Sequence, residues 1–292
     1  MEIARTSKRL LLGCTLLFCV GASAAQTTIH LPLEPYRNRL AARIEVAGKP
    51  RLFQFDTAGG ITLVSPALAK EIGCTPWGSL TGFHMTGAKI SAPRCDAVRM
   101  AWKDVPLTLP VVGVLDVGSP ESPVDGLLSL DAFAGRTISI DFAAGDFVIE
   151  TPQSAAERIR GAIEVPAHMA RELSGRALSM FVDVPTAKGP LRMELDSGNG
   201  GTILVSRNNL ALLGLDAKTE APQTGRFTIA PGVEAQGLIF SPDLVLDGNL
   251  GMPFLKDWVV TLDLERGRVW LKRSTTRPPA RLGVPPATAK GK

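Results

Sequence analysis

Aromatic side chains are scarce in this sequence, and so are histidine and cysteine. Only 5% of the 292 residues are aromatic, with one tyrosine, three histidines and four cysteines. So few cysteines exclude a disulfide-dense scaffold, and neither they nor the histidines show a zinc-binding spacing. After the N-terminus, no apolar run approaches the roughly 20 residues that a transmembrane helix needs. The sequence also lacks GxSxG, P-loop and dinucleotide-binding motifs, so it does not indicate a serine hydrolase, an NTPase or a dehydrogenase.

The composition is otherwise that of a folded protein with many turns. Hydrophobic residues make up 45% and charged residues 21% of the chain, which also has 29 glycines and 22 prolines. These proportions exclude disordered and collagen-like classes. Abundant glycine and proline favour strands and turns over long helices. The length suggests about two domains of roughly 100–150 residues each.

Residues 1–25 have the three-part pattern of a secretory signal peptide. Basic residues at positions 5, 8 and 9 precede the apolar run LLLGCTLLFCVGA, and small residues then lead to Gln26. We expect cleavage just before Gln26 or one residue earlier, and export to the periplasm or out of the cell. A membrane anchor is one alternative, although the run is short for it. A lipoprotein modified at Cys14 is the other.

The positive net charge comes from the two ends of the chain. The formal charge is +4, of which residues 1–25 contribute +2 and residues 272–292 contribute +6, leaving about −4 for residues 26–271. The basic ends therefore do not indicate a nucleic-acid-binding face on the folded part. Residues 274–292 are basic and proline-rich, which predicts a disordered tail. Contact of this tail with anionic lipid or cell-wall polymer is the alternative.

The mature chain retains two cysteines, Cys74 and Cys95, because the other two lie within the signal peptide. Two thiols that are 21 positions apart in an oxidising compartment predict one disulfide. Closing such a loop is worth about 3 kcal/mol in the chain-entropy model. Two separate buried thiols are the alternative.

One segment of the sequence occurs twice. FDTAGGITLVS (residues 55–65) recurs as LDSGNGGTILVS (residues 195–206). In both copies an apolar residue precedes Asp-Thr or Asp-Ser, and a glycine-rich turn leads into an apolar run that ends in Val-Ser. A short helical stretch follows each copy. The second copy is one residue longer in its turn.

A second repeated block lies downstream of each Asp turn. DGLLSLDAFAGRTISIDFAAGDFVIE (residues 125–150) aligns without a gap on DGNLGMPFLKDWVVTLDLERGRVWLK (residues 247–272). In each copy two alternating apolar runs flank a short turn that ends in glycine, which predicts a β-hairpin. The sequence therefore predicts two all-β halves, residues 26–152 and 163–273, with one short helix in each.

The repeated aspartates have a clear chemical use if the halves pack about a pseudo-twofold axis. Asp56 and Asp196 would then meet, and two carboxylates at hydrogen-bond distance share one proton. Such a pair can hold a water molecule between a general base and a general acid, without a metal or a cofactor. The hydroxyls of Thr57 and Ser197 would bond across the joint. A surface turn is the alternative for either copy alone, but the repetition favours a functional turn.

These two blocks resemble the retropepsin-like aspartic proteases. More narrowly, the chain is similar to bacterial secreted aspartyl-protease-like proteins with two retropepsin-like repeats. The resemblance implies one closed barrel-like lobe per half, in a pepsin-like pseudo-twofold arrangement with a cleft between the lobes. It also implies the site residues: the catalytic Asp56 and Asp196, the turn residues Thr57, Ala58, Gly59, Ser197 and Gly198, and a flap around Gly82, His84 and Gly87.

Two functions are compatible with these residues. Retention of both aspartates favours an endopeptidase that acts as a monomer on peptide or protein substrates. Departures from the family pattern favour a non-catalytic periplasmic module that holds an extended peptide by strand addition. The departures are Ala58 in place of glycine, Ser129 where the second half has Gly251, and a flap without tyrosine. A surface role is the alternative for His84.

Overall fold

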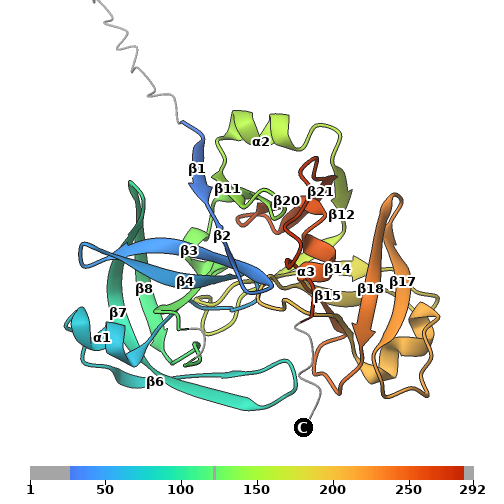
Figure 1. Ribbon diagram of the computed structural model, residues 1–292, viewed down its shortest axis with the longest axis horizontal. Coiled ribbons are helices and arrows are strands. Elements are labelled where there is room, and N and C mark those ends of the chain that lie inside the picture. The colour runs from blue at the N-terminus through green and yellow to red at the C-terminus, as the bar shows by residue number, and fades with distance from the viewer. Residues whose placement is uncertain (1–26, 121–122, 286–292) are drawn as a thin grey trace, which may run out of the picture.

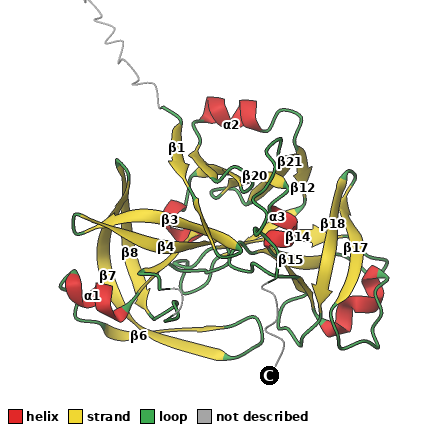
Figure 2. Ribbon diagram, viewed as in Figure 1, coloured by secondary structure: helices red, strands yellow, loops and turns green. Residues whose placement is uncertain are grey.

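The computed structural model describes residues 27–120 and 123–285, which form two lobes joined by a shared sheet (Figure 1). Strands dominate both lobes, and the helices are short (Figure 2). The expected signal peptide, residues 1–25, lies outside the described residues.

The first lobe is built on an eight-stranded sheet with the order β2-β3-β4-β9-β5-β8-β7-β6 and an additional β3–β7 pairing. Its strands are β2 (Glu34–Tyr36), β3 (Arg39–Val46), β4 (Lys49–Asp56), β5 (Leu63–Val64), β6 (Trp77–Phe83), β7 (Lys89–Trp102), β8 (Val105–Val114) and β9 (Gly126–Ser129). Cys74 and Cys95 form the predicted disulfide, with 6.1 Å between their Cα atoms. This bond closes a loop that contains β6 and the turn into β7.

The second lobe repeats this plan in a seven-stranded sheet with the order β13-β14-β15-β19-β16-β18-β17. Its strands are β13 (Ala167–Ala170), β14 (Ser179–Val184), β15 (Leu191–Leu195), β16 (Ile203–Val205), β17 (Gln223–Ala230), β18 (Val233–Phe240) and β19 (Gly248–Leu250). In both lobes the strand that leads to the aspartate pairs in parallel with the first strand of the downstream repeated block, β4 with β9 and β15 with β19. This block begins with Asp-Gly and is called the Asp-Gly block below (residues 125–150 and 247–272).

A six-stranded sheet with the order β1-β11-β10-β20-β21-β12 joins the two halves. Its strands are β1 (Ile29–Pro32), β10 (Thr137–Asp141), β11 (Asp146–Ile149), β12 (Ile163–Val165), β20 (Trp258–Asp263) and β21 (Arg268–Arg273). The two predicted hairpins are thus β10–β11 and β20–β21, and they pair with each other through β10 and β20. Ser139 lies opposite Thr261 at the centre of this pairing, with 2.8 Å between the buried hydroxyls.

Each lobe contains the short helix expected after its Val-Ser segment. This is α1 (Pro66–Glu71) in the first lobe, capped by Ser65, and the 3-10 helix η2 (Arg207–Leu213) in the second. A further short helix lies within each downstream repeated block, before its hairpin: η1 (Leu130–Phe133) and α3 (Met252–Leu255). Within the described residues, each lobe therefore has two short helices, where the sequence predicts one. Helix α2 (Pro152–Arg158) lies in the joint between the halves.

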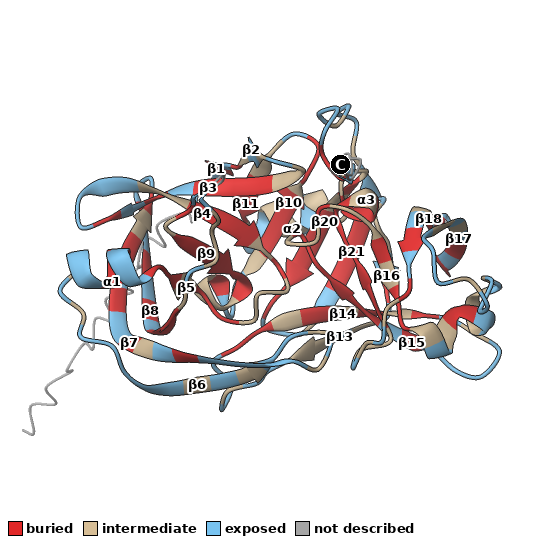
Figure 3. Cartoon of the chain, turned by 60° about the horizontal axis from the view of Figure 1, so that its bottom comes forward, coloured by how far each residue is buried: buried red, intermediate tan, exposed pale blue. Residues whose placement is uncertain are grey.

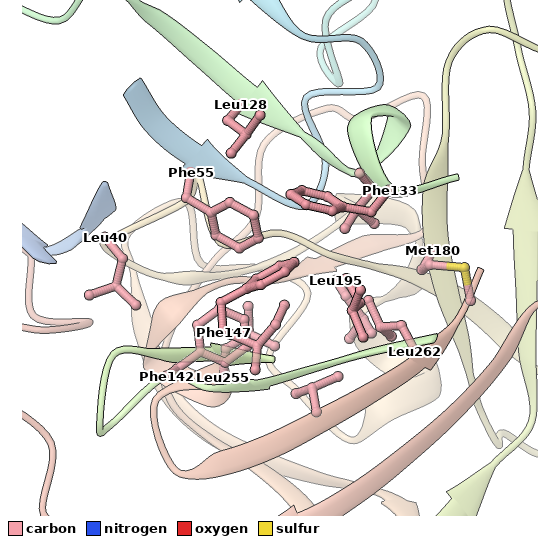
Figure 4. Close-up of a cluster of buried hydrophobic side chains, with 14 of the residues drawn as sticks. Leu40, Phe55, Leu128, Phe133, Phe142, Phe147, Met180, Leu195, Leu255 and Leu262 are labelled. Atoms are coloured by element: carbon pink, nitrogen blue, oxygen red, sulfur yellow. The ribbon is translucent and has the colours of Figure 1, made fainter. Parts of the chain in front are cut away.

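Aromatic and aliphatic side chains form the core between the Asp-bearing strands and the shared sheet (Figure 4). Phe147 lies at its centre, with its ring centroid 5.6 Å from that of Phe55 and 4.6 Å from that of Phe133. Phe55 and Leu195 are almost completely buried and directly precede the two aspartates. Because side chains alternate along a strand, this burial turns Asp56 and Asp196 toward the opposite face.

The segment 274–285 is ordered against the body, whereas the sequence predicts disorder over residues 274–292. Leu282 is 3% exposed, and Gly283 donates its amide hydrogen to the carbonyl oxygen of Asn38 at 3.0 Å. At the start of the segment, the Ser274 hydroxyl donates to the Asp141 carboxylate. One buried leucine and a few hydrogen bonds fix this segment despite its proline content. Residues 286–292 lie outside the described part of the chain.

Candidate active site

The two Asp turns hold each other by reciprocal hydrogen bonds. The Thr57 hydroxyl donates to the carbonyl oxygen of Leu195 at 2.6 Å, and the Ser197 hydroxyl donates to that of Phe55 at 3.2 Å. Each hydroxyl also accepts the main-chain N–H of the other residue at 3.0 Å. Both hydroxyls therefore bond across the joint as the sequence predicts, and they fix the two lobes together beside the aspartates.

Asp56 and Asp196 are brought together at this joint, and their carboxyl groups are hydrogen-bonded to each other. Burial and, next to it, the adjacent charge of Asp196 together raise the pKa of Asp56 to about 8. The N–H of Ala58, which donates to Asp56 Oδ1 at 2.9 Å, opposes this shift. At neutral pH Asp56 therefore holds the proton that the two carboxyl groups share.

Two asparagines surround Asp196. The main-chain N–H of Asn199 donates to Asp196 Oδ1 at 3.0 Å, and Asn249 Nδ2 donates to Asp196 Oδ2 at 2.6 Å. The side chain of Asn199 donates in turn to Asn249 Oδ1 at 2.9 Å, and Asn249 is completely buried. These N–H groups stabilise negative charge on Asp196. The pair is therefore asymmetric, with the proton on Asp56 and the charge on Asp196.

Sequence reasoning missed both asparagines. Asn249 lies in the second Asp-Gly block at the position where the first block has Leu127. The replacement of an apolar residue by a polar one between otherwise matching repeats was the available signal. Asn199 occupies the turn that is one residue longer in the second copy.

Side chains pack closely against the glycines at two positions of these turns. A Cβ atom on Gly198 would overlap the carboxylate of Asp56. A Cβ atom on Gly59 would lie 2.5 Å from Leu127 Cδ2 and 3.2 Å from Ser129 Oγ. Ala58, by contrast, is accommodated in the first turn and keeps its main-chain bond to Asp56. The departure from glycine at this position thus leaves the hydrogen bond to the carboxylate in place.

The hairpin of β6 and β7 extends from the first lobe across to the second (Figure 1). Its turn is closed by two main-chain bonds between His84, Gly87 and Ala88, and Gly87 has a left-handed φ of 83°. At its tip the carbonyl oxygen of Met85 accepts the N–H of Val245 from the second lobe at 2.9 Å. Most of β6 is exposed (Figure 3). The predicted flap thus spans the two lobes.

The contacts of His84 and Gly82 in the flap are local. The exposed His84 ring lies 2.9 Å from the Thr86 hydroxyl and so belongs to the turn itself. Gly82 has open space around its Cα atom. The aspartates of the Asp-Gly blocks have structural roles: Asp125 accepts the N–H of Leu52, and Asp247 accepts that of Arg192, each at 2.9 Å.

Residues 27–120 and 123–285 contain no group of three or more acidic, histidine or cysteine side chains placed to hold a metal ion. Within the same ranges, every helix is too short or too polar to cross a membrane.

Neither a protein-family model nor a curated protein sequence matches this chain. Solved structures do resemble it. Conglutin gamma, a basic 7S globulin from lupine seeds, superimposes with a TM-score of 0.55 at 10% identity, covering 85% of this chain and 95% of its own. Basic 7S globulin from soybean gives a TM-score of 0.54 with the same identity and coverage. The chain therefore has the predicted all-β, two-lobe, pepsin-like fold.

Proposed function

We propose that this protein is an exported aspartic endopeptidase of the retropepsin-like family, with Asp56 and Asp196 as its catalytic pair. The observation that carries this proposal is the pair itself: the carboxyl groups of Asp56 and Asp196 meet at a joint that Thr57 and Ser197 fix from both sides. The Cys74–Cys95 disulfide fits an extracellular or secreted protein. A signal peptide over residues 1–25 and lobes over residues 26–152 and 163–273 belong to this proposal.

The asymmetry of the pair assigns a role to each carboxyl group. Asp196 is the general base, since the N–H groups of Asn199 and Asn249 stabilise its charge. Asp56 is the general acid, since its raised pKa keeps it protonated. Asp196 takes a proton from a water molecule whose oxygen bonds to the peptide carbonyl carbon, while Asp56 gives its proton to the carbonyl oxygen. When the C–N bond breaks, the amine takes the proton from Asp196, and Asp56 recovers its own from the diol.

The position of the flap favours an extended peptide as the substrate. Its hairpin crosses from one lobe to the other and bonds to Val245 at its tip. Phe83 beside the tip is 70% exposed and Val245 is 65% exposed. Edges of a hairpin can pair with an extended chain, and exposed apolar side chains on both lobes can cover it.

Cleavage of a denatured protein by the purified chain from Gln26 onward is the direct test, followed by mass spectrometry from acid to neutral pH. We expect cleavage by the wild type and none by Asp56→Asn or Asp196→Asn. Asp104→Asn, an exposed aspartate in a turn of the first lobe, is the matched control and retains activity. Cleavage that survives in either catalytic variant contradicts the proposal. Folded variants and a wild type that all bind peptide without cutting would indicate a binding module.

The pH profile gives a separate prediction. Because the mechanism needs a protonated Asp56 whose pKa is about 8, kcat/KM should persist at pH 7 and fall as pH rises through about 8. The positive charge of Arg39 lowers the pKa of Asp56. Arg39→Gln should therefore move this decline to higher pH. A decline at pH 5 in the wild type, or a shift to lower pH in Arg39→Gln, would contradict the assignment of Asp56 as the acid.

A further inference from the structure

A third carboxyl group, Glu194, lies on the same face of the second lobe as Asp196. It precedes Asp196 by two residues, and Leu195 between them points into the core (Figure 4). Strand alternation therefore places Glu194 and Asp196 together on the cleft side of β15. Glu194 is 8% exposed and lies within the electrostatic reach of both catalytic carboxyl groups. The proposed mechanism gives it no role.

The first lobe has a different residue at the equivalent position. Counting back from each aspartate, Gln54 corresponds to Glu194, and both are 8% exposed. The strand registers pair Ala41 with Gln54 and Phe181 with Glu194, so Arg39 in one lobe corresponds to Ser179 in the other. Arg39 donates to Gln54 Oε1 at 3.1 Å. The two sides of the catalytic pair therefore differ in charge: a cation on the first, a carboxyl group on the second.

Glu194 has no cation of its own. Its neighbouring donor is the Ser179 hydroxyl, and no arginine, lysine or histidine in the described part of the chain lies within ion-pair distance of it. Burial raises the pKa of Glu194 well above its usual range, and the negative charge of Asp196 and, more weakly, that of Glu172 add to the effect. Burying a carboxyl group without a nearby positive charge costs free energy. A positively charged ligand group that hydrogen-bonds to the carboxyl group would offset this cost.

A groove lies on the second lobe next to neighbours of Glu194. Its volume is about 400 Å³, and its lining includes Phe181, Arg192 and Val245 but not the buried Glu194 itself. Phe181 is the cross-strand partner of Glu194, and Val245 receives the flap tip. The basic groups in this groove are already matched, since His168 and Arg192 lie 3.0 and 3.9 Å from Asp183.

We propose that Glu194 selects a basic side chain, lysine or arginine, in the substrate residue that lies on the second-lobe side of the scissile bond. The proposal rests on the proposed function, because a scissile bond at the joint places its two flanking residues over different lobes. Gln54 and Arg39 offer no acidic group on the other side. The preference therefore concerns one of the two flanking positions and not both.

Glu194→Gln is a sharp test because it installs the residue that the first lobe already has at this position. A chymotryptic peptide library, which retains internal lysine and arginine, is cut by wild type, Glu194→Gln and the exposed control Glu234→Gln. We expect about tenfold enrichment of basic residues at one flanking position with wild type and control, and none with Glu194→Gln. Cleavage without this enrichment, or enrichment that survives in Glu194→Gln, would overturn the inference.

A second measurement separates this inference from the proposed function. The same library is passed over immobilised Asp56→Asn and over the double variant Asp56→Asn/Glu194→Gln, and the retained peptides are sequenced. Basic peptides should be retained about tenfold more by the single variant. Equal retention by both would refute the role of Glu194. If the wild type does not cleave, but retention of basic peptides still depends on Glu194, the result would contradict the proposed catalysis and leave the role of Glu194 in binding intact.

Discussion

Asp56→Asn is expected to stabilise the folded protein at pH 8 while it abolishes cleavage. The raised pKa means that folded Asp56 keeps its proton between pH 3.8 and about 8, whereas the unfolded chain has lost it. Over that range the wild type loses stability as pH rises. Asparagine does not titrate and keeps an oxygen that can accept the N–H of Ala58. We expect a gain of about 1–3 kcal/mol in the free energy of unfolding at pH 8.

Chemical denaturation at pH 3, 5.5 and 8 measures this gain. The difference between Asp56→Asn and the wild type should be near zero at pH 3, where both states of the wild type bind the proton, and should grow toward pH 8. Asp104→Asn, on the exposed surface, should show no such growth. A gain that is constant with pH, or a loss at pH 8, would show that Asp56 does not carry a raised pKa.

The repeated segments made much of this fold predictable. Two matching Asp turns and two matching hairpin blocks imply one plan used twice, and the carboxyl groups must then meet at the axis between the copies. Thr57 and Ser197 could be assigned their bonds because a hydroxyl next to each aspartate points at the same joint. The disulfide could be predicted because two cysteines remained.

What escaped prediction depends on differences between the copies and on contacts distant in sequence. Asn249 and Glu194 stand at positions where the first half has leucine and glutamine, and a search for similarity passes over such differences. The bond from Val245 to the flap joins residues about 160 positions apart, which no local pattern specifies. Leu282 orders the C-terminal segment through a single buried side chain, against a composition that predicts disorder.

Asn249→Leu should reduce kcat by about 100-fold with little change in KM. Leucine is the residue of the first block, so its side chain suits this element of the fold. The substitution removes the N–H that Asp196 Oδ2 accepts at 2.6 Å and the oxygen that fixes the Asn199 side chain. Loss of one preorganised hydrogen-bond donor to a charged group in an active site lowers the rate by roughly 10²–10³-fold. Asn249 acts through Asp196 and is a positioning residue.

A role in folding alone would give a different result. Asn209→Ala is the matched control, because Asn209 also donates its amide to a carboxylate, Asp247 Oδ1 at 3.0 Å, but away from the pair. Both variants should lose stability, whereas only Asn249→Leu should lower kcat while KM stays nearly the same. That split follows because the Asn249 amide contacts Asp196 rather than the substrate. A folded Asn249→Leu protein with the wild-type kcat would mean that Asp196 does not depend on this amide, and that the roles of the two carboxyl groups are not set by the asparagines.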